Sequence, residues 1–200
     1  MRVTAETQAA TRERILESAR KLFAVGGFEA ATTRDIARGA DIAVGTVFNY
    51  FPTKEAIVEA LAARALAGVD QEASRHDAEL GSLEEALFAF VAGGLRKLRP
   101  LRKYLPAILE SALSPLAAGG KDAEGLRLAH IETVARLASR HGFPDLSPVA
   151  LQIYWSLYLG LLLFWANDGS PRQEDTLALL DHSLEMFTGW LNHSRNDALP

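Results

Sequence analysis

Apolar residues recur every three or four positions along most of the chain, which is the period of an amphipathic helix. Such stripes begin near residues 15, 57, 83 and 128, and Ser82 with Glu85 predicts a capping box before the third of them. No stretch of the sequence alternates convincingly with period two, so strands are not expected. The fold is therefore predicted to be all-α. The first stripe consists of Ile15, Leu16, Ala19, Leu22 and Phe23.

Cap residues suggest how these helices are grouped. Thr11 is expected to cap the first helix, because no hydrophobic period precedes it. Thr53 follows a proline and is expected to cap a helix that reaches about Arg75 and connects the two parts of the chain. The predicted organisation is a mobile arm, a small helical domain and a larger helical domain, at residues 1–10, 11–55 and 56–200.

The longest uncharged run, residues 147–167, is long enough to span a membrane. It begins with Ser147 and Pro148, a helix-start signal, and it contains Gln152 and Ser156. It also lacks basic flanks. These features favour a fully buried helix of a soluble protein, with no membrane partner.

Composition narrows the possible classes of function. The chain has no cysteine, which excludes disulfides and thiolate metal sites. The net charge is -4, but residues 1–55 carry eight Lys and Arg against seven Asp and Glu, whereas the remainder carries thirteen against eighteen. The N-terminal part is thus the better candidate for binding a polyanion. The polar N-terminus does not resemble a signal peptide, so a cytoplasmic location is expected.

Residues 32–54 have the inward and outward pattern of a helix-turn-helix. Thr32 and Asp35 predict a capped short helix, Asp41 suits the turn, and a second short helix is expected from Ala43 to Tyr50. An ordinary helical hairpin is the alternative. The predicted inner face is Ile36, Ala37, Ile42, Val47 and Phe51, and the outer face is Ala43, Val44, Thr46, Asn49 and Tyr50.

Three further segments of the sequence form a specific pattern. They are Gly27-Phe28-Glu29-Ala30, Thr33-Arg34-Asp35-Ile36-Ala37 and residues 44–55. Over roughly residues 11–61 they resemble the N-terminal domain of TetR/AcrR-family transcriptional regulators. The resemblance implies a homodimer whose recognition helices enter successive major grooves of a palindromic operator, repressing transcription until a small-molecule effector binds. The remaining two thirds of the chain resembles that family only in architecture, as a helical ligand-binding and dimerisation domain.

The resemblance also implies DNA contacts by position. Ala43 and Val44 stand where many members of the family have Ser and Lys, and no Arg or Lys lies between Ala43 and Phe51. Bidentate reading of guanine from this helix is therefore excluded, whereas Asn49 is suited to adenine. Thr33, Tyr50 and Lys54 are expected to hold phosphates, Val44, Thr46 and Asn49 to face bases, and Arg34 to add a base or phosphate contact.

The second domain supplies candidates for ligand binding and self-association. Aromatic and polar residues of the kind that build an apolar pocket are Tyr104, His130, Gln152, Trp155 and Tyr158, with core packing as the alternative role. A seam with spacings of 3, 4, 3 and 4 predicts a dimer interface, with packing inside one subunit as the alternative. The seam consists of Leu177, Leu180, Leu184, Phe187 and Leu191.

Catalytic chemistry is not expected. The five histidines fall in no metal-ligand spacing, and the sequence has neither a glycine-rich phosphate loop nor a G-x-S-x-G motif. No catalytic residue, metal or cofactor is therefore predicted. The predicted function is a dimeric transcriptional regulator, and a helical dimerisation or ligand-binding module without specific DNA binding is the alternative.

Overall fold

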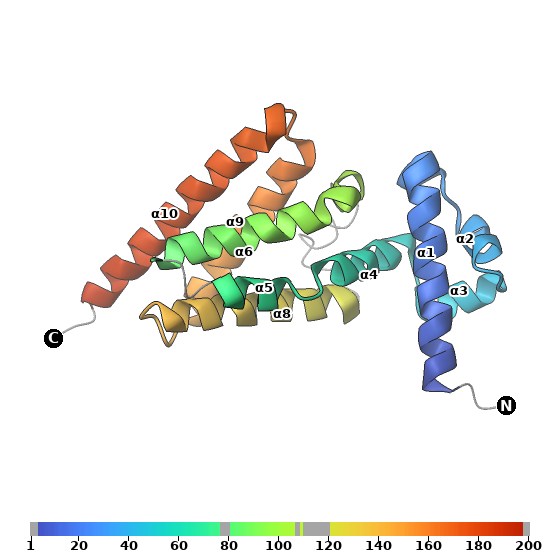
Figure 1. Ribbon diagram of the computed structural model, residues 1–200, viewed down its shortest axis with the longest axis horizontal. Coiled ribbons are helices and arrows are strands. Elements are labelled where there is room, and N and C mark those ends of the chain that lie inside the picture. The colour runs from blue at the N-terminus through green and yellow to red at the C-terminus, as the bar shows by residue number, and fades with distance from the viewer. Residues whose placement is uncertain (1–3, 77–80, 107–108, 110–120, 198–200) are drawn as a thin grey trace.

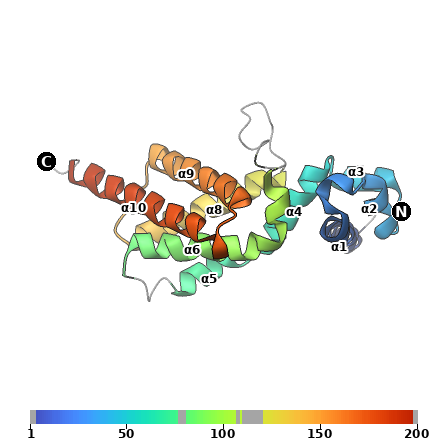
Figure 2. The same ribbon diagram turned by 90° about the horizontal axis from the view of Figure 1, so that it is seen from above.

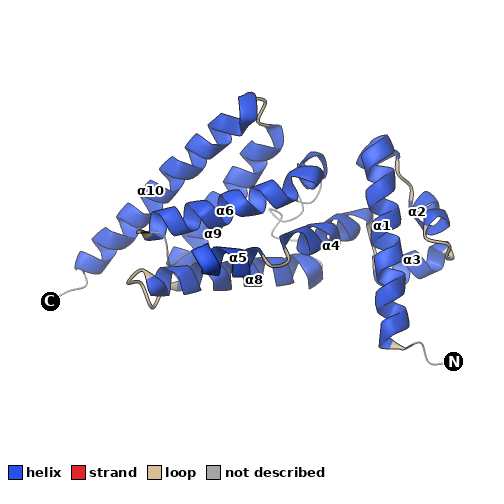
Figure 3. Cartoon of the chain, in the orientation of Figure 1, coloured by secondary structure: helices blue, strands red, loops and turns tan. Residues whose placement is uncertain are grey.

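The chain is elongated, with a small N-terminal group of helices at one end and a larger helical bundle at the other (Figure 1). The computed structural model describes residues 4–76, 81–106, 109 and 121–197. Across these ranges all regular structure is helical, as Figure 3 shows by colour. The all-α prediction is confirmed.

Helix α1 (Ala5–Ala30) begins earlier than the sequence pattern suggested. The Thr4 hydroxyl accepts a hydrogen bond from the Thr7 backbone N–H and caps the helix, while the Thr11 hydroxyl donates to the Thr7 carbonyl inside it. The predicted arm through residue 10 and cap at Thr11 are therefore wrong. A helix start needs a cap and good helix formers, not an apolar stripe, and residues 4–10 supply these.

Helices α2 (Thr33–Gly39) and α3 (Val44–Tyr50) pack beside α1 through a small apolar core. The Ser18 hydroxyl of α1 donates a 2.9 Å hydrogen bond to the Ile36 carbonyl of α2 inside this core. Gly27, with φ of 80°, bends the end of α1 so that the Phe28 ring is buried. The most buried members are Ile15, Leu16, Phe23, Ile36, Val47 and Phe51.

Helix α4 (Lys54–Leu66) connects the two parts of the molecule, as predicted, but it is shorter than expected. The Thr53 hydroxyl caps it by accepting from the Ala56 N–H. The chain leaves the helix at Ala67 and passes through Gly68, whose φ of 81° belongs to the left-handed region that glycine tolerates. A separate helix, α5 (Val69–His76), follows, so the predicted extension to Arg75 is wrong.

The larger part of the chain is a helical bundle, seen from above in Figure 2. Ser82 and Ser147 cap their helices as the sequence predicts. Helix α6 packs against α4, α5, α8 and α10, so it lies at the centre of the bundle. The remaining elements are α6 (Leu83–Leu98), η2 (Arg99–Tyr104), α8 (Lys121–Arg140), α9 (Pro148–Asn167), η3 (Pro171–Gln173) and α10 (Glu174–Asp197).

Helix α9 is long and apolar enough to cross a membrane, yet only 39% of its most apolar window is buried. One side, including Tyr154 and Trp165, is buried within the chain. The other side leaves Val149, Ile153 and Phe164 exposed. The prediction of a fully buried helix is therefore wrong, because α9 lies at the edge of the bundle and packs on α8, α10 and η2 from one side.

The regular apolar seam of helix α10 packs inside its own subunit. The seam residues from Leu180 onward face α6 and α9 of the same chain, and only Leu177, with 39% of its surface exposed, reaches the solvent. Assigning the buried four to a dimer interface is therefore wrong, because side chains enclosed by their own subunit have no surface left for a second copy. The buried four are Leu180, Leu184, Phe187 and Leu191.

Candidate nucleic-acid interface and regulatory cavity

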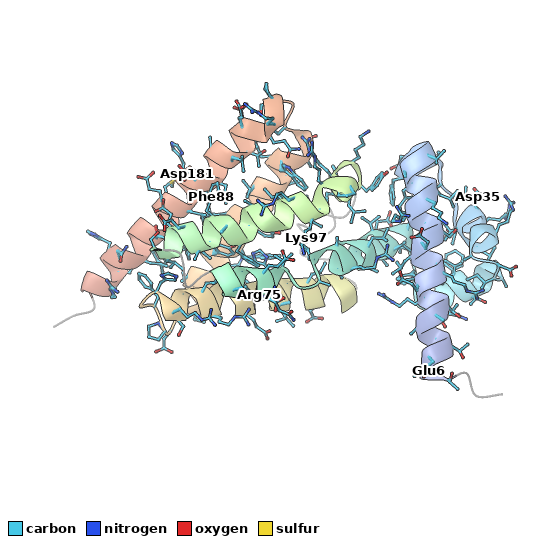
Figure 4. All side chains as sticks on the ribbon, viewed as in Figure 1. Glu6, Asp35, Arg75, Phe88, Lys97 and Asp181 are labelled. Atoms are coloured by element: carbon cyan, nitrogen blue, oxygen red, sulfur yellow. The ribbon has the colours of Figure 1, made fainter. Side chains whose placement is uncertain are left out.

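The turn that joins α2 to α3 is built from local polar contacts. Asp35, labelled in Figure 4 at the α2 end of the molecule, donates its backbone N–H to the Thr32 hydroxyl oxygen at 3.1 Å. The Thr32 hydroxyl in turn donates to the Asp35 carboxylate at 2.5 Å and, together with Arg38, lowers the pKa of that carboxyl. Asp41 adopts the left-handed conformation expected for the turn, with φ of 53°. These contacts fix the direction in which α3 leaves α2.

Helix α3 divides into a buried side and an exposed side. Val47 is fully buried against α1 and α2, whereas Gly45 and Asn49 are exposed on the opposite side. Ala43 precedes the helix without a side-chain capping bond, in line with the missing polar residue noted in the sequence. The flanks of this exposed side carry the half-buried residues Val44, Thr46 and Tyr50, and the start of α2 carries half-buried Thr33 and exposed Arg34.

Phe48 is a residue of this surface that sequence reasoning missed. Half of its surface is exposed, although it is large and apolar. It lies directly before Asn49 and outside the inward pair Val47 and Phe51. An apolar residue off the inward stripe of a short helix was the signal that could have identified it.

Lys54 has a structural role that its sequence position did not suggest. Its ammonium donates a 2.9 Å hydrogen bond to the Phe28 carbonyl and lies 4.4 Å from the centre of the Phe28 ring. The side chain therefore ties the start of α4 to the end of α1. Because an ammonium has three N–H donors, a phosphate contact by Lys54 stays a prediction beside this role.

Two short helices joined by a tight turn, the first braced by a core and the second exposed, define a helix-turn-helix DNA-binding domain. Residues 15–61 match the family described as bacterial regulatory proteins, tetR family. The N-terminal domain of the chain is thus similar to the DNA-binding domain of TetR-type regulators.

Curated relatives agree with this assignment. The transcriptional repressor KstR of Mycobacterium tuberculosis is 33% identical over 92 residues, which are 46% of this chain and 41% of KstR. The transcriptional regulator UidR of Escherichia coli K12 is 39% identical over 51 residues, or 26% of each chain. The chain thus matches less than half of the length of these relatives.

Solved structures extend the likeness to the whole fold. FadR of Thermus thermophilus, a TetR-family repressor in complex with lauroyl-CoA, has a TM-score of 0.72 at 24% identity, covering 88% of this chain and 93% of FadR. A TetR regulator from Rhodococcus sp. RHA1 has a TM-score of 0.69 at 20% identity, covering 90% and 96%. At this identity the likeness shows the fold, including the arrangement of the C-terminal bundle.

A cavity with a volume of about 380 Å³ lies in the bundle beside the end of α4. Its walls come from α4, the Gly68 turn, α5, α6, α8 and α9. They are mostly apolar, as in typical ligand pockets. The lining includes Ala63, Leu66, Ala67, Asp70, Phe90, Gly94, Leu126, His130, Thr133 and Tyr158.

His130 and Tyr158, two of the five predicted ligand residues, lie in the wall of this cavity. Their ring centres are 4.1 Å apart, and His130 Nε2 lies 3.0 Å from the Tyr154 hydroxyl. Burial lowers the pKa of His130 to about 3 and raises the pKa of Tyr158. The imidazole and both phenols are therefore neutral at physiological pH.

The other three predicted ligand residues do not line the cavity. The Tyr104 hydroxyl donates to the Phe23 carbonyl at 2.6 Å and joins η2 to α1, next to the DNA-binding domain. Gln152 is exposed and accepts a hydrogen bond from Arg127. Trp155 is half-buried, with the Arg127 guanidinium 5.5 Å from its ring. A ligand contact by any of these three residues stays a prediction, since Tyr104 also borders a second cavity of about 280 Å³.

Helices α9 and α10 each expose an apolar strip, and the two helices pack against each other. We call these two strips the α9–α10 face. The positions are separated by 4 and then 11 residues on α9 and by 7 and then 4 residues on α10, and both sets of spacings place a strip on one side of its helix. Gly160 and Gly189 have open space around them. The α9–α10 face consists of Val149, Ile153 and Phe164 on α9, and Leu179, Met186 and Trp190 on α10.

Proposed function

We propose that this chain is a homodimeric, sequence-specific transcriptional repressor that a small molecule releases from a palindromic operator. The observation that carries the proposal is α3, which is braced from inside by Val47 and exposes Phe48 and Asn49 to the solvent. A helix held in this way fits the major groove. The family match over residues 15–61 supports the same reading.

The side chains of α3 favour a particular mode of base reading. Asn49 matches the donor and acceptor pattern of adenine, and the Val44 side chain and the Thr46 methyl suit thymine methyl groups. Phe48 adds apolar surface beside them. Since α3 carries no cation, phosphate binding falls to Thr33, Arg34, Tyr50 and Lys54 around it.

Dimerisation through the α9–α10 face would supply the second recognition helix. Exposed apolar strips on adjacent helices are unusual for a monomer and are typical of subunit interfaces. Helices α9 and α10 lie away from α1–α3, so pairing there leaves both DNA-binding domains free (Figure 1).

The cavity of about 380 Å³ is the proposed effector site. Ala63, Leu66 and Ala67 at the end of α4 form part of its wall, while Lys54 at the start of α4 is bonded to α1. A ligand that displaces α4 would therefore move the DNA-binding domain, with a coupling free energy of about 1–3 kcal/mol. The complexes of Thermus thermophilus FadR with lauroyl-CoA and Bacillus subtilis FadR with stearoyl-CoA support an effector site in this fold.

We also propose that the protein is a non-catalytic regulator of the cytoplasm, which agrees with its TetR-type N-terminal domain. Helix α9 is then a helix of the core and of the dimer interface, which accounts for its apolar length without a membrane. The alternative function, a helical dimerisation or ligand-binding module without specific DNA binding, leaves the exposed side of α3 unexplained.

Selection of bound sequences from random duplex DNA at physiological salt tests the proposal. We expect enrichment of a palindromic site with two half-sites. Enrichment of single half-sites would contradict binding as a dimer. A pool without any enriched sequence would contradict specific DNA binding.

A further inference from the structure

The cavity wall holds a tyrosine hydroxyl that forms no hydrogen bond with protein in the part of the chain that the structure describes. Tyr158 is 8% exposed and lines the cavity. Its ring contacts His130, Tyr154 and Trp155, but its hydroxyl forms no hydrogen bond with any described residue. Every fully buried side-chain polar atom of the described residues has a hydrogen-bond partner, so this unpartnered hydroxyl is not enclosed by protein but reaches accessible space. The Tyr158 hydroxyl is therefore available to a bound molecule.

His130 supplies a second donor beside it. Tyr154 is 2% exposed, and within the described ranges its hydroxyl bonds only to His130 Nε2. A hydroxyl hydrogen so deeply buried needs an acceptor, so Tyr154 donates and Nε2 accepts. In a neutral imidazole the ring hydrogen then resides on Nδ1. Nδ1 has no acceptor among the described residues and is free to donate.

The charges of the wall restrict the ligand further. Asp70 is the one charged side chain among the described lining residues, and its carboxylate lies 4.0 Å from the Arg136 guanidinium. Neither Lys nor Arg belongs to the described lining, so an anionic group would enter without a counter-charge. The other lining residues are largely apolar, apart from Thr133, whose hydroxyl already donates to the Ala129 carbonyl.

We propose that this cavity binds a neutral, mainly apolar molecule whose carbonyl oxygen accepts hydrogen bonds from the Tyr158 hydroxyl and His130 Nδ1. This inference rests on the proposed function only in taking the cavity as the effector site. The polar anchor is the Tyr158–His130 pair, and the body of the ligand lies against Phe90, Leu66 and Leu126. Two donors on rings whose centres are 4.1 Å apart would orient the molecule within an otherwise apolar space.

Three probes of similar shape separate the possible ligand classes. They are 2-acetylnaphthalene, a neutral ketone, 2-ethylnaphthalene, which lacks an acceptor, and 2-naphthoate, an anion. Binding to the full chain without DNA is measured by titration calorimetry. We expect the ketone to bind about tenfold more tightly than either of the others, because it alone satisfies both donors without burying a charge.

Tyr158→Phe keeps the ring and removes the hydroxyl. This variant should reduce ketone affinity about five- to tenfold and leave the affinity for 2-ethylnaphthalene unchanged. Tyr104→Phe is the matched control, since its hydroxyl bonds to Phe23 outside the cavity, and it should leave both affinities unchanged. Circular dichroism of both variants verifies that the fold is kept.

Several results would overturn the inference. One is undetectable binding of the ketone, and another is tighter binding of 2-naphthoate or lauroyl-CoA than of the ketone. A third is an equal loss of affinity for the ketone and for 2-ethylnaphthalene in Tyr158→Phe. None of these would affect an enriched palindromic operator, so the proposed repressor function would stand. Conversely, if the chain bound the ketone but selected no DNA sequence, the proposed repressor function would be contradicted and the proposed ligand of the cavity would be supported.

Discussion

The Lys54 ammonium donates a hydrogen bond to the Phe28 carbonyl, 26 residues earlier, and rests 4.4 Å from the Phe28 ring centre. This contact joins the first turn of α4 to the bent end of α1. Since α4 also borders the cavity, the Lys54–Phe28 contact is one of the links between the proposed effector site and α1, beside the Arg64–Glu13 ion pair.

Replacing Lys54 by Met should weaken the connection between α4 and α1. The substitution removes the hydrogen bond and the cation–ring contact but keeps the aliphatic stem, so we expect the free energy of unfolding to fall by about 1–3 kcal/mol. Urea unfolding measures this free energy. Lys103→Met, at an exposed lysine of η2, is the control and should change stability by less than about 0.5 kcal/mol. Equal stability of the two variants would contradict the structural role.

DNA binding by the same variant tests the phosphate role separately. If Lys54 also contacts a phosphate, the slope of log K against log salt should decrease by about 1 per half-site in Lys54→Met. An unchanged slope would show that Lys54 contacts no phosphate and acts only through its contact with Phe28.

Asn49→Ala should relax base preference at one position of each half-site by about 1–3 kcal/mol, because its amide is suited to adenine and is exposed on α3. A selection repeated with the variant measures this preference. Gln152→Ala removes an equally exposed amide from α9 and should leave the selected site unchanged. An identical site for Asn49→Ala and the unaltered chain would remove Asn49 from the reading surface.

Phe48→Ala should weaken operator binding with little effect on stability. Half of the Phe48 side chain is exposed, so truncation creates no core cavity, whereas it removes apolar contact from the proposed DNA surface. Fluorescence anisotropy with the selected operator gives the affinity, and urea unfolding gives the stability. A loss of stability above about 2 kcal/mol would show that Phe48 acts in folding.

Local features of the fold were predictable from the sequence. Thr32, Asp41, Thr53 and Ser82 act through hydrogen bonds or backbone conformations within four residues of themselves, and the structure has each in its predicted role. The outer side of α3 followed from the same reasoning, because a short helix with one buried residue leaves the opposite side exposed. Thr4 was overlooked because capping does not require an apolar stripe.

Contacts between distant segments were not predictable in this way. The spacing of Leu180 and Leu184 indicates an apolar stripe, but it does not say which helix covers the stripe. Tyr104 and Tyr158 are the same residue type, yet one bonds to α1 and the other lines the cavity. Only the packing of helices far apart in sequence decides between these roles.

The dimer proposal makes opposite predictions for two neighbouring residues of α10. Met186 is 70% exposed on the α9–α10 face, so Met186→Glu should give a folded monomer. Leu184 is 3% exposed within its own subunit, so Leu184→Ala should cost about 2–5 kcal/mol of stability. Sedimentation equilibrium and urea unfolding measure these effects. Val25→Glu, at a 93% exposed residue of α1, is the control for added charge and should remain dimeric.

A monomeric unaltered chain would contradict the proposed interface directly. A Met186→Glu variant that stays dimeric would move the interface to another surface. Either result leaves the core role of Leu184 intact, because that role depends only on burial within one subunit.

The neutral state of His130 makes stability depend on pH. Its pKa is about 3 in the folded chain, because burial opposes the charged form, and about 6.5 when unfolded. The unfolded state therefore binds the proton more readily, and stability is lost as pH falls from about 6.5 towards 3. This group alone should lower the free energy of unfolding by about 2 kcal/mol between pH 7 and pH 5.

Urea unfolding at pH 7, 6 and 5 measures this dependence in a window above the titration of most carboxyls. His130→Phe should be less stable at pH 7, because Tyr154 loses its acceptor, but it should lose the additional slope between pH 7 and 5. His182→Gln replaces an exposed histidine and should keep the slope. If His130→Phe retained the full slope, the pH dependence would arise elsewhere, and the neutral imidazole that donates from Nδ1 would lose this support.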